Sequence, residues 1–448
     1  MSALSRYRGG AAEGNLMSLP APAPVELDSE QRLRLDPDQR NPQLDRFREL
    51  MGRMVIGQPG ALETITNSFS RVLAGISDPE RPILTQMLLG PTGVGKTETV
   101  RALGEALFGT RKGYVRINCQ EYSAHYNLSK LLGSPPGYVG GEIKPLLCQE
   151  NLDRHHKRAF EEGLGMFHDG RGRVTRLFPD DEDAYLSLVL FDEIEKAHPK
   201  LWNMLLGILE DGHLVLGNNE EVDFTHSIII VTTNVGSESM GAHIASDGIG
   251  FKGGFEGGRL DKDIHEAAMN EAKKVFPFEF LNRFDEMVVY DTLKEQHLYQ
   301  ILDNLIANIH IRSIDCTEPF LLRVEGDAKT KLVDIGTDPQ FGARPLRRAV
   351  ETELVTPISN LICSGQIVRG DLITVALDSG SFVFEKEPGG MNSEEIARFE
   401  QLREDKEKAR DLEGSDDGGE AAQIAPEIDQ IVAHSKSLMQ TGASDLKD

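Results

Sequence analysis

Residues 90–97 read Gly90-Pro91-Thr92-Gly93-Val94-Gly95-Lys96-Thr97, which matches the pattern G-x-x-x-x-G-K-[ST]. Glycines at three of these positions let the backbone curl, so that successive N–H groups point at one anion. In this pattern the lysine reaches the β- and γ-phosphates of a nucleotide, and the threonine hydroxyl is a ligand of Mg²⁺. The stretch therefore predicts a site for a nucleoside triphosphate, with Lys96 on the phosphates and Thr97 on the metal.

The flanking sequence provides the surroundings that this pattern requires. An apolar run over 83–89 predicts a buried strand before the loop, and the apolar spacing over 97–108 predicts a helix after it. That helix would add the positive end of its dipole to the anion site. The alternative is a glycine-rich turn before an ordinary helix, which the presence of both strand and helix disfavours.

An acidic pair follows a second apolar run, Leu188-Val189-Leu190-Phe191. A buried strand here would deliver Asp192 and Glu193 to its carboxyl end, where parallel α/β sheets bind their ligands. Asp192 would support the Mg²⁺ shell, largely through water, and Glu193 has the chemistry of a general base for an attacking water. The alternative is an acid pair that begins a helix and needs no ligand.

Three more polar residues are candidates for contact with phosphate. Asn234 ends the apolar run 228–233, Arg283 lies in the motif 280–284, and Arg344 lies in the motif 341–345. An asparagine at the end of a strand can reach the γ-phosphate or hold the attacking water, but it is also a common turn-former. Arginines near phosphate neutralise charge in the transition state, whereas isolated arginines equally fit surface ion pairs.

Length and composition limit the classes of protein that this chain can be. With 448 residues, 39% of them apolar and 27% charged, it can hold two or three globular domains. Its formal net charge is −24. Broad binding to nucleic acid or to an anionic membrane needs clustered Lys and Arg, so this charge argues against both partners.

Cysteine usage and hydropathy favour a cytoplasmic protein. The cysteines lie far apart, without the spacing of metal ligands, and are expected to be reduced thiols. They are Cys119, Cys148, Cys316 and Cys363. There is no apolar run long enough to span a membrane, and no apolar stretch of a secretory signal follows Arg6 and Arg8.

The chain divides into four stretches by composition. Residues 1–42 are rich in Pro and Ala and are expected to be a disordered arm. In 43–290, strands alternate with helical segments, which predicts an α/β fold with a parallel five-stranded sheet. Residues 291–386 predict a small, mostly helical domain with a short C-terminal sheet, and 387–448 an acidic tail that is partly helical or disordered. Strands are expected at 84–89, 113–118, 186–191, 227–232, 286–290, 372–376 and 382–384.

Together these motifs resemble one family, the AAA+ ATPases, and within it the second ATPase module of the ClpB, ClpA and ClpC protein unfoldases. The resemblance runs from Val55 to about Phe384. It is carried, in order, by the motifs at 55–58, 90–97, 134–140, 192–199, 233–237, 281–285 and 342–346. It implies a large α/β subdomain, a small helical lid subdomain and an ATP-dependent ring of identical subunits, usually a hexamer.

The resemblance assigns roles to residues by their positions in these motifs. Val55 and Ile56 belong to the adenine pocket, and Asn234 takes the first sensor position. Arg283 becomes the arginine finger, which acts on the ATP of the neighbouring subunit. Arg344 becomes the second sensor, which reports the nucleotide state to the lid. The expected cofactors are ATP and Mg²⁺.

The segment Gly137-Tyr138-Val139-Gly140 distinguishes between kinds of AAA+ protein. In the family this loop faces the central pore of the ring. An aromatic side chain between glycines can grip a polypeptide through apolar and stacking contacts without reading its sequence. The resemblance therefore assigns the gripping of protein substrates to Tyr138 and Val139. The alternative is a proline- and glycine-rich turn with a surface tyrosine.

The sequence also departs from the family pattern. It contains no amino-terminal substrate-binding domain, first ATPase module or coiled-coil middle domain. The stretch 141–185 is longer than in family members by roughly two dozen residues, and we interpret it as an insertion near the pore entrance. It carries His155, His156 and His168, for which solvated side chains are a better interpretation than metal ligands.

Ile249, Gly250 and Phe251 form a tripeptide that precedes a glycine-rich run. ClpX- and ClpA-type unfoldases carry a similar tripeptide in a loop that docks into a ClpP-type peptidase ring. Two apolar side chains on a glycine-rich loop make a good anchor for a hydrophobic pocket. The tripeptide equally fits an apolar contact with its own domain, so the peptidase partner stays open.

Three functions of different classes remain. The leading one is an ATP-driven protein unfoldase or disaggregase. The second is a nucleotide-gated scaffold that remodels one dedicated partner, which fits the proline-rich arm and the acidic tail. The third is a nucleic-acid-directed AAA+ machine, which the acidic charge and Tyr138 oppose.

Overall fold

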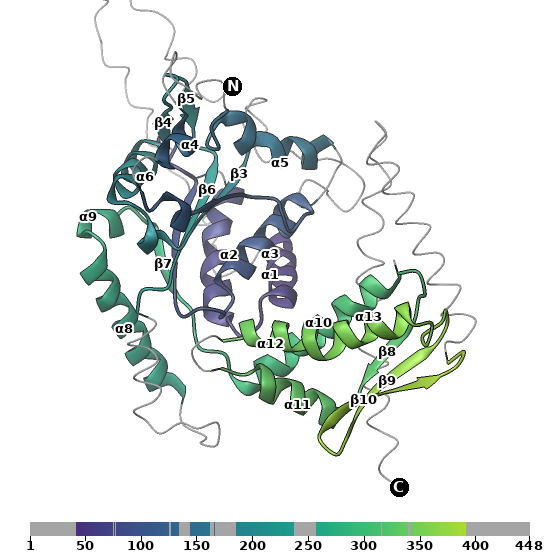
Figure 1. The fold of residues 1–448 in the computed structure, drawn as a ribbon. Coiled ribbons are helices and arrows are strands. Elements are labelled where there is room, and N and C mark those ends of the chain that lie inside the picture. The colour runs from purple at the N-terminus through teal and green to yellow at the C-terminus, as the bar shows by residue number, and fades with distance from the viewer. Residues whose placement is uncertain are drawn as a thin grey trace, which may run out of the picture.

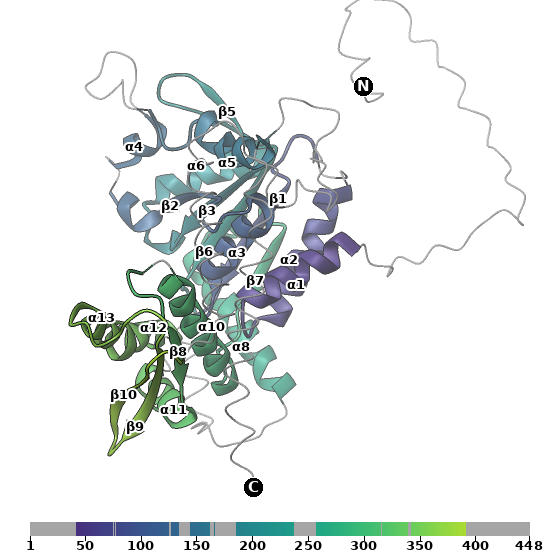
Figure 2. The same cartoon turned by 90° about the vertical axis from the view of Figure 1, so that its right-hand side faces the viewer.

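The computed structural model describes most of the chain between residues 42 and 390. The described residues are 42–74, 76, 78–124, 127–133, 144–161, 165, 185–236, 257–314, 316–338 and 342–390. Tyr138 and Val139 lie outside them, as do the tripeptide 249–251 and most of the two terminal stretches. Figures 1 and 2 show an α/β part that extends to β7, with a second part, from α10 onward, lying beside it.

The α/β part is built on a sheet of five parallel strands in the order β2-β3-β6-β1-β7. The strands are β1 (Leu84–Leu89), β2 (Val115–Asn118), β3 (Ser187–Asp192), β6 (Ser227–Thr233) and β7 (Glu286–Val289). The parallel sheet predicted from the sequence is confirmed, and each strand lies within two residues of its expected bounds. β1, β3 and β6 are buried along their whole length, so apolar residues occupy consecutive positions in them, although β1 also buries the polar residues Thr85 and Gln86.

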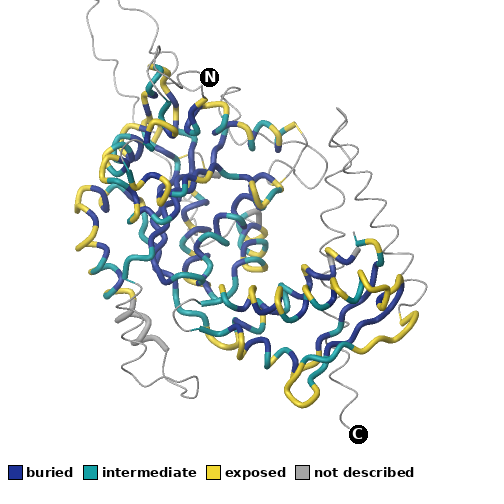
Figure 3. The backbone as a smooth tube through the Cα atoms, in the orientation of Figure 1, coloured by how far each residue is buried: buried dark blue, intermediate teal, exposed yellow. Residues whose placement is uncertain are grey.

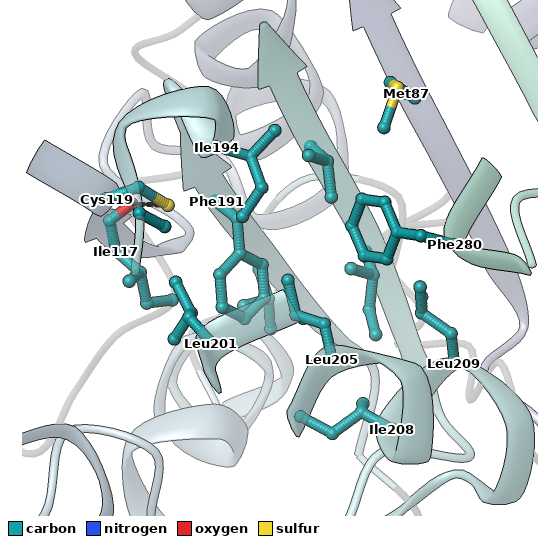
Figure 4. Packing of buried hydrophobic residues seen from close by; sticks show 14 of the residues in the cluster. Met87, Ile117, Cys119, Phe191, Ile194, Leu201, Leu205, Ile208, Leu209 and Phe280 are labelled. Atoms are coloured by element: carbon teal, nitrogen blue, oxygen red, sulfur yellow. Dashed lines mark hydrogen bonds between the residues drawn. The ribbon is translucent and has the colours of Figure 1, made fainter. Parts of the chain in front are cut away.

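Successive side chains of each strand enter two different cores, because they point to opposite faces of the sheet. Met87 and Phe191 pack with α6 (Pro199–Asp211), α8 (Gly257–Val275) and α9 (Phe278–Leu281). Leu88 and Leu190 pack with α1 (Pro42–Met54), α2 (Pro59–Ala74) and α3 (Lys96–Phe108). Figure 3 shows the buried strands between these helical layers, and Figure 4 shows part of the first core.

Smaller elements complete the α/β part. They are the 3₁₀ turns η3 (Cys119–Tyr122) and η6 (Ile194–Lys196), α4 (Leu128–Leu132), α5 (Gln149–Glu161), and a hairpin of β4 (His213–Val215) and β5 (Glu221–Asp223). Helix α5 falls in the stretch 141–185 that we interpret as an insertion. It packs Leu152 into one core and Ala159 into the other, so this helix belongs to the body of the domain.

The C-terminal part has its own core and a small mixed sheet. Its elements are α10 (Glu295–Ile314), β8 (Leu321–Val324), α11 (Gly326–Gly336), α12 (Arg344–Val350), the π-helical turn η7 (Glu351–Val355), α13 (Thr356–Cys363), β9 (Leu372–Asp378) and β10 (Ser381–Glu387). The two short strands expected near the end are confirmed as β9 and β10. Strand β8 was not expected, because its short apolar run between helices carries little periodicity of its own.

Candidate active site

The loop 90–97 connects the carboxyl end of β1 to the first turn of α3. Gly90, Gly93 and Gly95 have φ values of 148°, 80° and 117°, which side chains rarely tolerate. Gly90 is also required for space, because a Cβ there would lie 3.0 Å from the Cβ of Tyr290. The loop and the start of α3 thus form a cradle for an anion, with Thr97 in the first helical turn.

Lys96 lies at the centre of the loop and is buried. Its Nζ donates to the carbonyl oxygens of Gly90 at 2.6 Å and Pro91 at 2.8 Å, and to Oδ1 of Asn234 at 2.9 Å. Burial lowers the pKa of Lys96 to about 8, against the opposing effect of the nearby carboxylates, first among them Glu195. The ammonium group therefore lies within reach of both the loop and the acids that follow β3.

Asp192 ends β3 and is held from two sides. The Thr232 hydroxyl donates to Asp192 Oδ1 at 2.6 Å, and Arg116 Nη2 pairs with Asp192 Oδ2 at 2.6 Å. Thr232 also accepts a hydrogen bond from the backbone N–H of Glu193 at 3.1 Å. One hydroxyl on β6 therefore orients both members of the acidic pair.

Glu193 has a left-handed backbone, with φ 59° and ψ 55°, which is uncommon for a residue other than glycine. Its Oε1 accepts a hydrogen bond from Asn234 Nδ2 at 3.2 Å, and its Oε2 pairs with Lys196 at 2.7 Å. Asn234 thus connects Lys96 to Glu193 through its two side-chain atoms. A strained backbone held by several partners is typical of functional positions.

Glu195 is a third acid of this site that sequence reasoning missed. Its Oε1 accepts the backbone N–H of Asn234 at 3.2 Å. Its Oε2 is buried and has no hydrogen-bond partner among the described residues. The signal was present in the sequence, since Glu195 follows Glu193 by two residues, but only the turn η6 brings it back toward Lys96.

The expected adenine side of the site lies beside the loop. Val55 is buried, and its Cγ1 lies 4.0 Å from where a Cβ on Gly95 would be, while Ile56 is partly buried. Buried Gln58 donates to the carbonyl oxygens of Val94 at 3.1 Å and Asp291 at 2.8 Å. Gln58 therefore connects the phosphate loop to the segment that leads into the C-terminal part.

The C-terminal part touches the phosphate loop directly. The N–H of Ala343 donates to the carbonyl oxygen of Gly93 at 3.2 Å. Gly342 has a φ of 59°, and a Cβ there would lie 2.8 Å from the same oxygen. Arg344 begins α12 at this contact. Its positive charge is close enough to lower the pKa of Lys196, but the hydrogen bond from Lys196 to Glu193 has the larger effect and raises that pKa overall. The structure thus brings Arg344 to the edge of the site.

Arg283 lies at the opposite edge of the sheet. The register of β7 on β1 pairs Gln86 with Glu286, and the carbonyl oxygen of Arg283 accepts from the Thr85 hydroxyl at 3.3 Å. Arg283 therefore lies near the amino end of β1, roughly 16 Å of extended chain from Gly90. Its guanidinium group pairs with Glu210 at 2.8 Å. Of the expected phosphate ligands in the described part of the chain, Arg283 alone is kept away from the site of its own chain.

The residues present fit a magnesium nucleotide. The glycine cradle, the helix N-terminus and Lys96 suit the phosphates, while the Thr97 hydroxyl and the Asp192 carboxylate are the oxygen donors that Mg²⁺ prefers. The described residues include no other cluster of His, Cys, Asp and Glu arranged to hold a metal. His155 and His156 lie on α5, and His168 lies outside the described residues. The expectation of a solvated side chain is wrong for His156, which is buried and accepts the N–H of Leu186.

Fold and site together define a P-loop nucleoside triphosphatase, with its loop after β1 and its acids after β3. Comparison with known families agrees. A model described as "AAA domain (Cdc48 subfamily)" matches residues 81–157 and 171–287. A model described as "C-terminal, D2-small domain, of ClpB protein" matches residues 293–375. The first model leaves 158–170 unmatched, within the stretch that we interpret as an insertion.

Two curated relatives extend this result. The ClpC ATP-binding subunit of the ATP-dependent Clp protease of Staphylococcus aureus (strain USA300) is 35% identical over 331 residues, which are 74% of this chain and 36% of the relative. The chaperone protein ClpB of Dichelobacter nodosus is 34% identical over 335 residues, which are 75% of this chain and 34% of the relative. The chain spans about a third of the length of these relatives.

Two solved structures of Hsp104 share the fold. One, a closed state with ATPγS and FITC casein, has a TM-score of 0.59 at 25% identity and covers 77% of this chain and 52% of that one. The other, the S. cerevisiae Hsp104:casein complex in an extended conformation, has a TM-score of 0.61 at 25% identity and covers 78% and 53%.

The chain belongs to the AAA+ ATPases, as a second ATPase module of the Clp type. Within the described residues, no helix is both long and apolar enough to cross a lipid bilayer.

Proposed function

We propose that this protein is an ATP-driven protein unfoldase or disaggregase that works as a hexameric ring of identical subunits. The observation that carries the ATPase part is the chain of hydrogen bonds from Lys96 through Asn234 to Glu193 at the carboxyl edge of the sheet. It joins the group that binds phosphate to the group that activates water. The kinship with ClpC, ClpB and Hsp104 supports action on protein chains.

The chemistry follows from the positions of these side chains. The loop and Lys96 bind the β- and γ-phosphates of ATP. Thr97 and, largely through water, Asp192 would hold Mg²⁺, which would neutralise phosphate charge. Glu193 accepts a proton from a water molecule as the water oxygen forms its bond to the γ-phosphorus. The bond from the γ-phosphorus to the bridging oxygen breaks, and ADP and phosphate leave. Asn234 keeps Glu193 oriented toward the phosphates.

Arg283 supports a ring rather than a monomer. Its backbone lies beside Thr85, roughly 16 Å of extended chain from Gly90, and its side chain pairs with Glu210, so it is suited to neutralise a γ-phosphate on another subunit. Arg344 differs, because α12 places it at the site of its own chain. One site would therefore combine Arg344 in cis with Arg283 in trans.

Tyr138 and Val139 are proposed to grip the substrate in the pore. The described residues on either side of 134–143 lie in contact, since a Cβ on Gly133 would be 2.9 Å from Cγ of Pro145. Gly217, next to the β4–β5 hairpin, donates to Leu132 O at 2.8 Å. The segment therefore leaves and rejoins the domain at one point, as a gripping loop requires.

Several finer points stay proposals. Docking of Ile249, Gly250 and Phe251 into a ClpP-type peptidase would make this the ATPase of a protease, and a cytoplasmic location fits reduced cysteines. A scaffold that remodels one dedicated partner is the alternative that the two terminal stretches favour. We do not expect a nucleic-acid or membrane partner, because of the acidic charge.

The variant Glu193→Gln tests the proposed activity. We expect it to bind ATP normally and to lower turnover at least ~100-fold, because the general base is lost. Held in the ATP state, it should also retain bound protein substrates in an affinity capture. Lys96→Ala is the control, since it should weaken ATP binding itself and retain none. Normal hydrolysis by Glu193→Gln would contradict the assignment of the base.

A further inference from the structure

The backbone around Arg283 is fixed by hydrogen bonds from Arg81 and Thr85, at the start of β1. Its carbonyl oxygen accepts from Arg81 Nη2 at 3.1 Å and from the Thr85 hydroxyl at 3.3 Å. Two residues later, the Asp285 carboxylate accepts from the N–H of Thr85 at 2.7 Å. The main chain that carries the Arg283 side chain is therefore anchored to the start of β1.

The side chain of Arg283 is oriented from a different element. Its Nη2 pairs with Oε1 of Glu210 at 2.8 Å, and both side chains are partly exposed, at 33% and 47%. Glu210 lies in the last turn of α6, on the outer surface of the α/β part. A solvent-facing pair such as this adds little stability, so its effect is mainly on direction.

Arg81 joins these two supports. While its Nη2 donates to Arg283, its Nε donates to the carbonyl oxygen of Leu209 at 3.3 Å. Leu209 is the residue before Glu210, and its carbonyl is among the last of α6, which lack partners within the helix. The guanidinium group of Arg81 thus connects the backbone of Arg283 to the backbone of Leu209, next to Glu210.

Packing keeps Arg81 at this position. Gly212 ends α6 in the left-handed conformation, and a Cβ there would lie 3.1 Å from Glu80 O and 3.6 Å from Arg81 Cα. Figure 4 shows Leu205 and Leu209 of α6 next to Phe280 of α9, the helix that precedes Arg283. The end of α6, the segment at Arg81 and the corner at Arg283 therefore form one packed unit.

From this arrangement we propose that Arg81 is a positioning residue for Arg283, with Glu210 as the second member of the brace. The proposal rests on the proposed action of Arg283 on the ATP of a neighbouring subunit. Arg81 lies nine residues before Gly90, at the other end of β1 from the phosphate loop of its own chain. By bridging the backbones of Leu209 and Arg283, it fixes the distance between the residues of the Arg283–Glu210 pair. The guanidinium group of Arg283 therefore points away from the surface in one direction. A planar group with donors at two nitrogens is suited to bridge two carbonyls, which a lysine cannot reproduce.

This role predicts a one-sided defect. A subunit with Arg81→Gln should bind and hydrolyse ATP in its own site when a neighbour supplies an intact arginine. It should fail to serve the site of the neighbour that depends on it. As a pure assembly it should lose at least ~10-fold of its turnover, since a small misplacement of a charge-neutralising group is costly. A variant that merely destabilised the fold would be defective on both sides.

Mixed assemblies of full-length chains test this. Arg81→Gln mixed with an excess of Glu193→Gln should hydrolyse ATP several-fold faster than the two variants do separately, because each Arg81→Gln site then meets an intact neighbouring arginine. Mixed with Arg283→Ala, it should gain nothing, because both subunits lack a working arginine. Glu210→Gln should give the same pattern of recovery. Because Glu210 is partly exposed, this variant should fold and can test the proposal if Arg81→Gln does not fold.

The reference mixture of Arg283→Ala with Glu193→Gln distinguishes the action of Arg283 across subunits from the positioning of Arg283 by Arg81 and Glu210. If this reference mixture shows no recovery, the action of Arg283 across subunits is wrong, and the proposed ring mechanism fails with it. If it recovers while mixtures with Arg81→Gln and Glu210→Gln do not, the brace is wrong and the ring mechanism stands. Recovery of Arg81→Gln by Arg283→Ala would also overturn the brace.

Discussion

Lys96 donates its hydrogen bonds to its own loop and to Asn234, while the acids around it support its positive charge. A buried ammonium group is disfavoured by loss of hydration, which is why its pKa falls to about 8. Glu195, Asp192 and Glu193 oppose that fall, and Glu195 comes first among them. At neutral pH the side chain therefore keeps the positive charge that phosphate binding needs. Glu195 therefore belongs to the site together with Asp192 and Glu193.

His156 supplies a prediction about pH and stability. It is buried in α5, and its Nδ1 accepts the N–H of Leu186, directly before β3. Burial lowers the pKa of His156 from 6.5 to about 4. As pH falls below 6.5 the unfolded chain takes up a proton that the folded chain refuses until about pH 4, so stability falls through this window. Between pH 7 and pH 5 the loss from this group should be about 2 kcal/mol.

Urea unfolding at the two pH values measures this loss. His156→Gln should lose about 2 kcal/mol less stability than the wild type on going from pH 7 to pH 5, because its side chain does not titrate. His213→Gln, at a half-exposed position in β4, is the matched control and should follow the wild type. Equal losses in the wild type and in His156→Gln would show that folding leaves the pKa of His156 unchanged.

At the scale of elements, α6 connects two functional regions. It begins at Pro199, three residues after Lys196, with His198 as its N-cap, and it ends at Gly212 beside Arg81. At 13 residues it is about 20 Å long, which is close to the length of the six-residue strand β1. One rigid element therefore extends from the acids of its own site to the brace of Arg283. In the proposed ring, this helix would connect adjacent ATP sites directly.

The contact of the C-terminal part with the phosphate loop yields a prediction for Gly342. Gly342→Ala places a Cβ 2.8 Å from the carbonyl oxygen of Gly93 and 2.9 Å from that of Thr92. The loop or α12 must then shift, and the hydrogen bond from Ala343 to Gly93 is lost. We expect ATP affinity to fall ~10-fold, which corresponds to ~1.4 kcal/mol. Titration with a fluorescent ATP analogue measures it.

Gly365 provides the matched control. Its φ is +73°, close to the +59° of Gly342, but nothing lies within 4 Å of the position of its Cβ. Gly365→Ala should therefore carry the same backbone strain, about 1–2 kcal/mol, and leave ATP affinity unchanged. If both variants bind ATP equally well, the contact between α12 and the loop does not contribute to the site.

At the scale of the whole molecule, a motor and a scaffold make different demands on Tyr138. An unfoldase that grips chains through this ring should keep its basal ATP turnover in Tyr138→Ala and lose unfolding of a tagged fluorescent protein. The lost apolar contact is worth ~2–3 kcal/mol. Tyr138→Phe is the control and should keep most activity, because the ring supplies the grip. Measuring ATP turnover beside unfolding separates the two effects.

A dedicated scaffold predicts the reverse pattern. Tyr138→Ala would then remodel its partner normally, and truncation at Pro24 or after Pro388 would abolish the interaction. Full unfolding activity in Tyr138→Ala would exclude threading through a Tyr138 pore, even if the ATPase assignment were correct.

Much of the fold and of the ATP site could be predicted because the signals are local. Five strands, the loop 90–97 and the ends of β3 and β6 are each set by short runs of sequence. Strand β8 was missed because it pairs with β9, some fifty residues later, and the β4–β5 hairpin was missed because its three-residue strands are too short to show an alternating pattern. Gln58, Arg116 and Thr232 were missed as site residues because their partners lie far away in sequence.

The sequence by itself determined the class of chemistry, because a phosphate loop needs glycine, lysine and threonine at fixed spacing within one turn of chain. It also determined the sheet, since the central strands β3 and β6 each carry four consecutive apolar residues. Only the tertiary structure decided which side chains act together. Parallel register places Asn234 between Lys96 and Glu193 and sends Arg283 to the opposite edge, and no spacing along the chain encodes that separation. The brace of Arg81, Glu210 and Arg283 likewise exists only after α6, β1 and the corner before β7 have packed together.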